Sequence, residues 1–245
     1  MSKNAERQFL KNMGRDGMDH TLGKPFLDRY CGVNLASIGT MMALFPEPPA
    51  AILDMGCGGG WTSIFFAKRG YTVVGQDISQ DMVELARHNQ EIQNVGGNLS
   101  FVNSDFESLG VDCQFDVVVF FDCLHHAEDE RAAIASAHRA LKPGGILVTH
   151  EPGEGHAATA GSIDAMERYG VTERDMPPHL IVRCALEIGF ASYRIYPMPA
   201  ELIQVFYLRP IPRLLSKAGF LRARRVLRAA FRPSARASSI VVLTK

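Results

Sequence analysis

The chain has 245 residues, of which 47% are hydrophobic and 21% charged, which is ordinary for a globular protein with one large domain. No apolar run is long enough to span a bilayer, and the segment Met1–Asp19 carries charges throughout, so we expect neither a transmembrane helix nor a secretion signal. The five cysteines fall in no metal or redox spacing, so we expect reduced thiols and a cytoplasmic location.

Strands and helices alternate from Ala50 onward, after an N-terminal stretch that we expect to form a helical cap. In chain order we expect a strand at Ala50–Met55, a helix at Trp61–Arg69 closed by Gly70, a strand at Tyr71–Gln76, a helix at Ser79–Gln90, a strand at Asn98–Asn103, a strand at Phe115–Phe121, a helix at Glu128–Leu141, a turn at Lys142–Gly145 and a strand at Ile146–His150. A helix at His179–Ile188 and strands at Tyr193–Pro197 and Ser239–Leu243 follow.

This alternation predicts an α/β fold with a doubly wound, mostly parallel sheet. The continuously apolar strands indicate that helices cover both faces of the sheet. We expect one domain over 1–245, with a cap at 1–49, a cofactor-binding core at 50–150, and substrate-side and C-terminal elements at 151–245. Ligands of such sheets bind at the carboxyl ends of the strands, so the chemistry should lie there.

The strongest motif is the run Ile52-Leu53-Asp54-Met55-Gly56-Cys57-Gly58-Gly59-Gly60. A glycine-rich turn after a first strand lets backbone approach a ligand closely. Its spacing is G-x-G-x-G, and Trp61 stands where a third dinucleotide glycine would be. The acidic Asp54 would repel a pyrophosphate, whereas it would attract the ammonium and sulfonium of S-adenosylmethionine.

Acidic residues end the next three strands as well. Asp77, at about the 20-residue spacing of a nucleoside site, can accept hydrogen bonds from ribose hydroxyls. Asp105 can accept the adenine amino group, while Phe106 covers the base. Asp122 ends the fourth predicted strand and is followed by Cys-Leu-His-His.

Taken together, LDMGCGGG, Asp77, Asp105, FDVVVFFD with LHH, and LKPGGILV resemble the class I, Rossmann-like methyltransferases with a small-molecule core. The resemblance covers about residues 50–150 and implies a seven-stranded sheet and S-adenosylmethionine as cofactor. It implies that the cofactor site contains Tyr30, Asp54, Gly56, Cys57, Gly58, Trp61, Asp77, Ile78, Met82, Asp105, Phe106 and Asp122. The alternative for Trp61 is packing under the first helix instead of contact with the ligand.

Four residues are candidates for a general base in transfer to a hydroxyl. They are His125 and His126 after the fourth predicted strand, and His150 and Glu151 at the end of the fifth. Each could instead be a structural part of its loop. Glu128 and Asp129 near the histidines raise the question of a metal, but surface charge and a helix N-terminus explain these acids, so we expect none.

The acceptor is the least defined part of the reaction. GCGGGWTS and the run HEPGEGH…YGVTERDMPP resemble methyltransferases of glycan or lipopolysaccharide biosynthesis, which favours O-methylation of a sugar, a lipid-linked glycan precursor or a related small molecule. Alternatives are a quinone, a natural product or an amine as acceptor, and a cofactor-binding protein without catalysis. No Asn-Pro-Pro-aromatic motif follows the fourth strand, so we expect no nucleic-acid substrate; the oligomeric state is left open.

The C-terminal segment is strongly basic. The net charge is zero, yet residues 202–245 hold ten Lys or Arg and no acid, which leaves 16 basic and 26 acidic residues in 1–201. On a helical wheel over Phe220–Arg232, apolar side chains gather on one side and arginines on the other, with Leu221 as an exception. This basic amphipathic helix either makes peripheral contact with the anionic inner face of a membrane or docks on the domain with its arginines in water.

Overall fold

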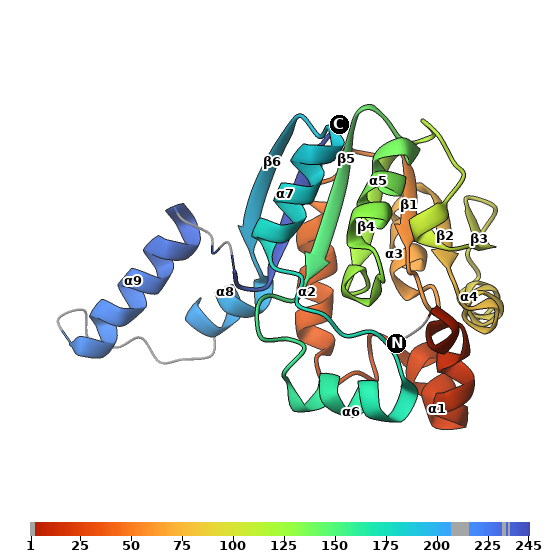
Figure 1. Cartoon of the computed structure of the whole chain (residues 1–245), viewed down its shortest axis with the longest axis horizontal. Coiled ribbons are helices and arrows are strands. Elements are labelled where there is room, and N and C mark those ends of the chain that lie inside the picture. Colours follow the sequence, from red (N-terminus) through yellow and green to blue (C-terminus); the bar gives the residue numbers. More distant parts are fainter. Residues whose placement is uncertain (1–2, 207–215, 232–233, 235) are drawn as a thin grey trace.

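The computed structural model describes residues 3–206, 216–231, 234 and 236–245. Its centre is a seven-stranded sheet of order β3-β2-β1-β4-β5-β7-β6 (Figure 1), in which β7 runs antiparallel to both of its neighbours and the other pairs are parallel. The strands are β1 (Ala51–Met55), β2 (Thr72–Asp77), β3 (Leu99–Asn103), β4 (Phe115–Phe121), β5 (Leu141–Glu151), β6 (Ser192–Pro197) and β7 (Ser239–Thr244). The predicted α/β class and doubly wound, mostly parallel sheet are confirmed.

Helices cover both faces of the sheet. They are α1 (Lys3–Gly23), α2 (Cys31–Met42), α3 (Trp61–Arg69), α4 (Gln80–Ile92), α5 (Glu130–Ala140), α6 (Ala160–Tyr169), α7 (Pro178–Ile188), α8 (Pro199–Phe206) and α9 (Lys217–Phe231), with short 3₁₀ turns η1 (Phe106–Ser108) and η2 (Leu124–His126). The cores show that α5 and α7 pack on one face, and α2, α3 and α4 on the other. The predicted N-terminal helices are therefore α1 and α2.

The strands are buried on both sides, as their continuous apolar runs predict. In β4, Val117 and Val119 point into the core with α3, whereas Val118 and Phe120 point into the core with α5. All four are fully buried. Successive side chains of a strand point to opposite faces, so only a sheet covered on both faces needs every position apolar.

Local signals place most helix ends correctly. Gly70 ends α3 in the left-handed conformation, and the Ser79 hydroxyl accepts the Met82 N–H at the start of α4. The helix predicted from Glu128 begins instead at Glu130. The reason is that Asp129 is its N-cap, because the carboxylate accepts the Ala132 N–H at 2.9 Å.

The predicted turn at Lys142–Gly145 is corrected by the structure. These residues belong to β5, which begins at Leu141, immediately after α5. The pairing of β4 and β5 jumps from Phe115–Leu141 to Val117–Ile146, so the Lys-Pro-Gly-Gly segment bulges out of the ladder. Gly144, at φ 77°, makes the bend.

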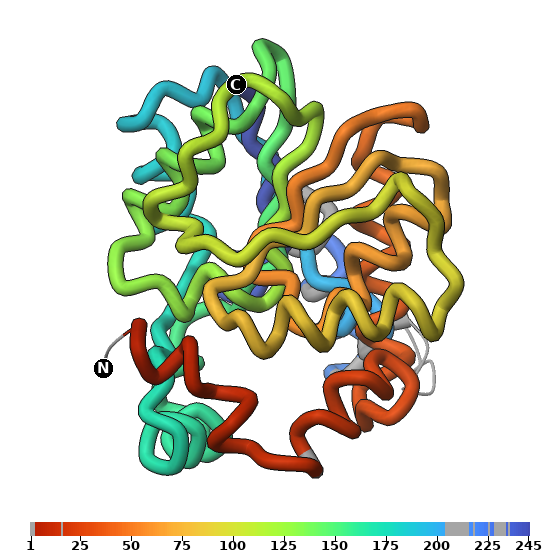
Figure 2. The backbone as a smooth tube through the Cα atoms, turned by 90° about the vertical axis from the view of Figure 1, so that its right-hand side faces the viewer, coloured from red at the N-terminus to blue at the C-terminus, as the bar shows by residue number. Residues whose placement is uncertain are grey.

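The carboxyl ends of the parallel strands point toward α1 and α6, which contact each other there (Figures 1 and 2). Beyond the edge of the sheet that β6 forms, α9 stands apart from the strands and contacts α8 (Figure 1). In the described ranges, no helix combines the length and the apolarity that a membrane crossing requires. All five cysteines are free thiols.

Candidate active site

A cavity of about 500 Å³ opens at the carboxyl ends of the strands, within the range of small-molecule sites. Its walls come from the loops after β1, β2, β3 and β4, together with α1, α6 and the segments that follow α1 and α6. The strand order reverses direction between β1 and β4, which is where ligands of doubly wound sheets bind. The cavity thus lies at the edge of the sheet where the strand–helix alternation predicts ligand binding.

The glycine turn after β1 forms one wall of the cavity. Gly56 (φ 68°) passes so close to Cys123 that a Cβ at Gly56 would lie 2.8 Å from its Sγ. Gly58 (φ 53°) also has a left-handed backbone, but a Cβ there would meet no atom within 4 Å. Because Gly58 lines the cavity, that open space is part of the cavity. The turn thus exposes backbone without side chains to the cavity.

Asp77 holds this turn against the next loop. One carboxylate oxygen accepts the Gly58 N–H at 2.9 Å, and the other accepts the Ser79 N–H at 2.9 Å. Burial raises the pKa of Asp77, although these N–H groups oppose the rise. The side chain lines the cavity, so its remaining acceptor capacity is available to a ligand's hydroxyls.

Asp54 lies behind the wall rather than on it. Its carboxylate is 1% exposed and accepts the hydroxyls of Thr62 and Ser63, both at 2.6 Å. Burial raises the pKa of Asp54 to about 6. Its contribution is to fix the first turn of α3 beneath the glycine loop, and direct contact with a ligand is not supported by this position.

Asp105 lines the cavity but already has partners. Its two oxygens accept the Lys3 Nζ at 2.6 Å and the Glu107 N–H at 2.9 Å. Lys3 also lies 2.8 Å from the Glu107 carboxylate. The first turn of α1 therefore lies over the region where the resemblance places adenine, and the contact of Asp105 with adenine stays a prediction.

Asp122 adopts a left-handed backbone (φ 50°), uncommon for a residue other than glycine and a mark of many functional sites. Its carboxylate lies on the cavity wall, 3.1 Å from His150 Nδ1. The other ring nitrogen of His150 contacts the Ser37 hydroxyl at 3.0 Å, and the ring stacks on Phe121. His150 is buried and outside the cavity lining, so it positions Asp122.

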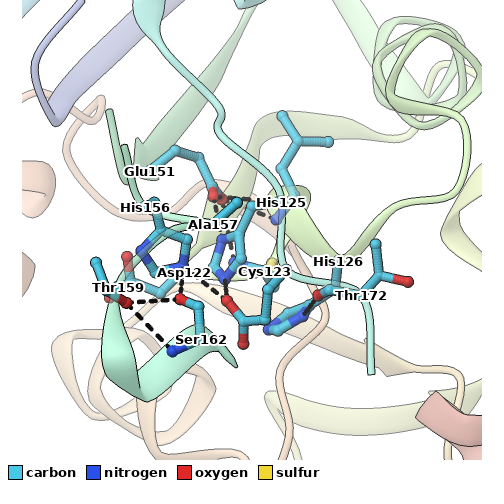
Figure 3. A network of polar contacts seen from close by, with 12 residues as sticks. Asp122, Cys123, His125, His126, Glu151, His156, Ala157, Thr159, Ser162 and Thr172 are labelled. Carbon is cyan, nitrogen blue, oxygen red and sulfur yellow. Dashed lines mark hydrogen bonds and ion pairs between the residues drawn. The ribbon is translucent and has the colours of Figure 1, made fainter. Parts of the chain in front are cut away.

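Glu151 organises the loop that follows β4. One of its oxygens accepts the N–H of Cys123 and Leu124, and the other contacts His125 Nδ1 at 2.7 Å (Figure 3). Glu151 is 1% exposed and does not line the cavity. Burial lowers the pKa of His125, but the bond to Glu151 outweighs burial, and the net pKa is raised.

His126 is the one predicted base candidate that lines the cavity. Its Nδ1 donates to the carbonyl of Thr172 (Figure 3), which leaves Nε2 free of that bond. Burial, reinforced by the charge of His125, lowers the pKa of His126 to about 4. The catalytic roles of the four candidates stay predictions, but their positions favour His126 for contact with an acceptor.

Two acidic residues absent from the sequence prediction complete this side of the cavity. Glu6 of α1 accepts the Thr172 N–H at 2.7 Å, and burial raises its pKa to about 7. Glu173, after α6, contacts His156 Nε2 at 2.7 Å and is 3.7 Å from His125 Nε2. Both line the cavity beside His126. No motif assigns either residue to the site, although Glu173 stands in the run YGVTERDMPP, because the fold brings them together from distant parts of the chain.

Eleven of the twelve predicted cofactor residues line this cavity, with Asp54 as the exception. Among the described residues, the lining holds seven carboxyl side chains against two lysines. Such a wall disfavours the pyrophosphate of a dinucleotide and favours a cationic ligand. Trp61 reaches the cavity but is 8% exposed and packs edge-on against Phe65 and Phe121, so it also serves the core.

Comparisons with known proteins agree with this geometry. The family model described as "Methyltransferase domain" matches residues 53–149. A ubiquinone biosynthesis O-methyltransferase of Coxiella burnetii is 36% identical over 97 residues, which are 39% of this chain and 41% of that protein. The corresponding enzyme of Pseudomonas aeruginosa is 35% identical over 94 residues. The chain thus matches about two fifths of the length of these curated relatives.

Solved structures extend the likeness to the whole fold. Phosphoethanolamine N-methyltransferase 2 of Haemonchus contortus, in complex with S-adenosyl-L-methionine, superposes with a TM-score of 0.65 at 18% identity, over 100% of this chain and 59% of that one. An S-adenosylmethionine-dependent methyltransferase of Mesorhizobium loti gives a TM-score of 0.59 at 20% identity, over 86% and 98%. The sequence match thus identifies a methyltransferase domain over residues 53–149, and the solved structures show that the chain as a whole has the fold of these methyltransferases.

Proposed function

We propose that this protein transfers a methyl group from S-adenosylmethionine to a hydroxyl of a small molecule. The observation that carries the proposal is the acidic cavity at the β1–β4 switch point, lined by eleven of the predicted cofactor residues. Its residues fit the group: the open space above Gly58 admits a ligand's chain, and Asp77 offers a carboxylate to a ribose. The bound cofactor would supply a methyl group already activated by its sulfonium.

The protein itself would then align the donor with the acceptor and supply the charged groups around them. The glycine turn and Asp77 would hold the nucleoside side, and the backbone around Asp122 would meet the amino-acid side. Holding acceptor and donor in line can contribute up to about 7–11 kcal/mol in ideal cases. Activation of the acceptor oxygen would fall to the polar group of Glu6, His126 and Glu173 in the lining of the cavity.

For the acceptor, the comparisons support a phenol or quinol hydroxyl, since the matched relatives are named ubiquinone biosynthesis O-methyltransferases. The sugar or lipid-linked glycan suggested by the sequence resemblance is the second candidate. A cofactor-binding protein without turnover is the alternative outside catalysis.

Two measurements test the proposal. Calorimetry should show binding of S-adenosylmethionine and of its demethylated product, and no comparable binding of NAD. Transfer of a labelled methyl group should then be measured with a catechol-type phenol, a dihydroquinone, a monosaccharide and an alkylamine. Tight NAD binding without either sulfur nucleoside would contradict the cofactor assignment. Cofactor binding without transfer to any acceptor would favour the non-catalytic alternative.

His126→Ala tests the role of the polar group formed by Glu6, His126 and Glu173, which we call the acceptor side of the cavity. We expect turnover to fall by roughly 10²–10⁴ while cofactor affinity changes little, because His126 lies beside Glu6 and Glu173 and is not among the residues predicted to bind the cofactor. His88→Ala is the matched control, since this histidine is exposed on α4 and outside the cavity. Near-normal turnover of His126→Ala with a good acceptor would remove the residue from the reaction.

A further inference from the structure

Three histidines and a glutamate gather at the acceptor side of the cavity. The rings of His125 and His126 have centroids 4.2 Å apart, and those of His125 and His156 are 4.9 Å apart. One ligand atom each of His125, His126 and Glu173 lies within 4.8 Å of the other two. From this cluster we infer a binding site for a divalent transition metal such as Zn²⁺, held by His125, His126 and Glu173.

The hydrogen bonds of the two histidines leave the correct atoms available. His125 Nδ1 faces the Glu151 carboxylate, and His126 Nδ1 faces the Thr172 carbonyl (Figure 3). Both partners accept, so each Nδ1 carries the proton and each Nε2 keeps a lone pair in the neutral ring. Carboxylate or carbonyl acceptors behind metal-bound imidazoles are the usual arrangement, because they fix the ring and its tautomer.

The third ligand comes from the segment that follows α6. The Glu173 carboxylate is 11% exposed, and one oxygen lies 3.7 Å from His125 Nε2 and 2.7 Å from His156 Nε2. Two imidazoles and one carboxylate form a ligand set known for both zinc and non-haem iron. Zinc at about 2.0–2.2 Å from each ligand atom would draw the three atoms closer than they lie here. His156 either completes the set or holds the carboxylate in place.

The position of the cluster gives the metal a consequence for the reaction. His126 and Glu173 line the cavity, so a coordination position left open would face the acceptor. A metal there could bind and polarise an acceptor hydroxyl. This consequence rests on the proposed function, whereas metal binding does not.

The test uses tag-free, chelator-treated protein titrated with Co²⁺, whose visible absorption reports nitrogen and oxygen ligands, followed by competition with Zn²⁺. We expect saturation at one equivalent and loss of the absorption when Zn²⁺ displaces it. His126→Gln and Glu173→Gln should each weaken binding by more than about 100-fold, and His156→Gln by about 10–100-fold, since loss of a ligand should cost more than loss of a supporting contact.

His88→Gln, on an exposed helix face, is the control and should bind as the wild type does. Thermal melting of each variant without metal checks that it folds. Absence of saturable absorption, or equal Co²⁺ affinity in wild type, His126→Gln and Glu173→Gln, would overturn the inference. Calorimetry with S-adenosylmethionine on the same samples separates the two proposals, because failure to bind the cofactor would contradict the proposed function and leave the metal titration intact.

Discussion

Single side chains in this site serve the fold and the ligand together. Asp77 closes the glycine turn through Gly58 and the next loop through Ser79, while it also lines the cavity. Asp122 combines a left-handed backbone with a contact to the buried His150. A substitution at either position therefore needs a stability measurement beside every binding measurement.

Replacing Asp77 should reduce the affinity for the cofactor more than the stability of the fold. We expect Asp77→Ala to lower affinity for S-adenosylmethionine by about 1–3 kcal/mol, because charged hydrogen bonds to the ribose are lost. Calorimetry measures the loss, and urea unfolding measures the effect on the turn. Asp81→Ala, in the first turn of α4 and outside the cavity, is the control. Unchanged affinity in Asp77→Ala would remove this residue from the cofactor site.

The pair of His150 and Asp122 should make stability depend on pH. Burial lowers the pKa of His150, but the charge and hydrogen bond of Asp122 outweigh burial, and the net pKa is raised. The groups facing the ring are Asp122, the Ser37 hydroxyl and the ring of Phe121. A raised pKa in the folded state means that the protonated ring stabilises the fold. This stabilisation is complete below about pH 6.5, the unfolded value, and is lost as pH rises through the folded value.

Urea unfolding of the wild type and His150→Gln between pH 5.5 and 8.5 measures this dependence. The stability advantage of the wild type should shrink as pH increases across the range. His88→Gln should show no such trend, because that ring is exposed. An advantage that stays constant or grows with pH would contradict the raised pKa.

At the scale of elements, alanine substitutions in two glycine turns can distinguish the cost of backbone strain from the loss of ligand contact. One turn lies between β1 and α3, and the other is the bulge in β5. Gly58 (φ 53°) and Gly144 (φ 77°) are both left-handed, and a Cβ at either would meet no atom within 4 Å. Alanine at each position should cost about 1–2 kcal/mol of stability. Only Gly58→Ala should also raise the Kd for S-adenosylmethionine, by about tenfold or more, because its methyl group enters the cavity. Equal affinities in the two variants would place the ligand elsewhere.

The sequence predicts the elements that local patterns define. It also predicts most of the residues proposed to bind the cofactor, because they directly follow predicted strands. The observed bounds of β4, Phe115–Phe121, agree with those that the sequence predicts, because six of its seven residues are apolar. The bulge in β5 was missed, since Lys-Pro-Gly-Gly gives the same local signal whether it ends a hairpin or loops out of a ladder. Glu6 and Glu173 were missed because tertiary packing alone brings them to His126.

At the scale of the whole molecule, the basic helix α9 departs from the layered domain. It contacts α8 and stands apart from the sheet (Figure 1). Phe220 and Leu227, on the predicted apolar side, are 68% and 57% exposed. Side chains of this size left in water on a helix that is free of acidic residues favour contact with an anionic lipid surface over docking on the domain.

Vesicle co-sedimentation tests this contact. We expect the protein to sediment with vesicles of mixed phosphatidylglycerol and phosphatidylcholine and to stay in solution with phosphatidylcholine alone. Each Lys or Arg near the surface should contribute about 1 kcal/mol, and binding should weaken with salt as the Debye length shortens. The double variant Phe220→Ser and Leu227→Ser should lose most of the binding. Leu186→Ser, which removes a 48% exposed leucine from α7, should not.

The salt series and the variants together show whether the protein binds its acceptor at a lipid surface or in solution. Binding to anionic vesicles that requires Phe220 and Leu227 would hold the cavity near a lipid surface, where a quinone or a lipid-linked glycan would be available. Equal, negligible sedimentation with both vesicle types at low salt would contradict the membrane contact and direct the acceptor screen to water-soluble molecules. Sedimentation that the double variant retains, and that salt abolishes, would show attraction by the ten basic residues of 202–245 without insertion of the apolar face.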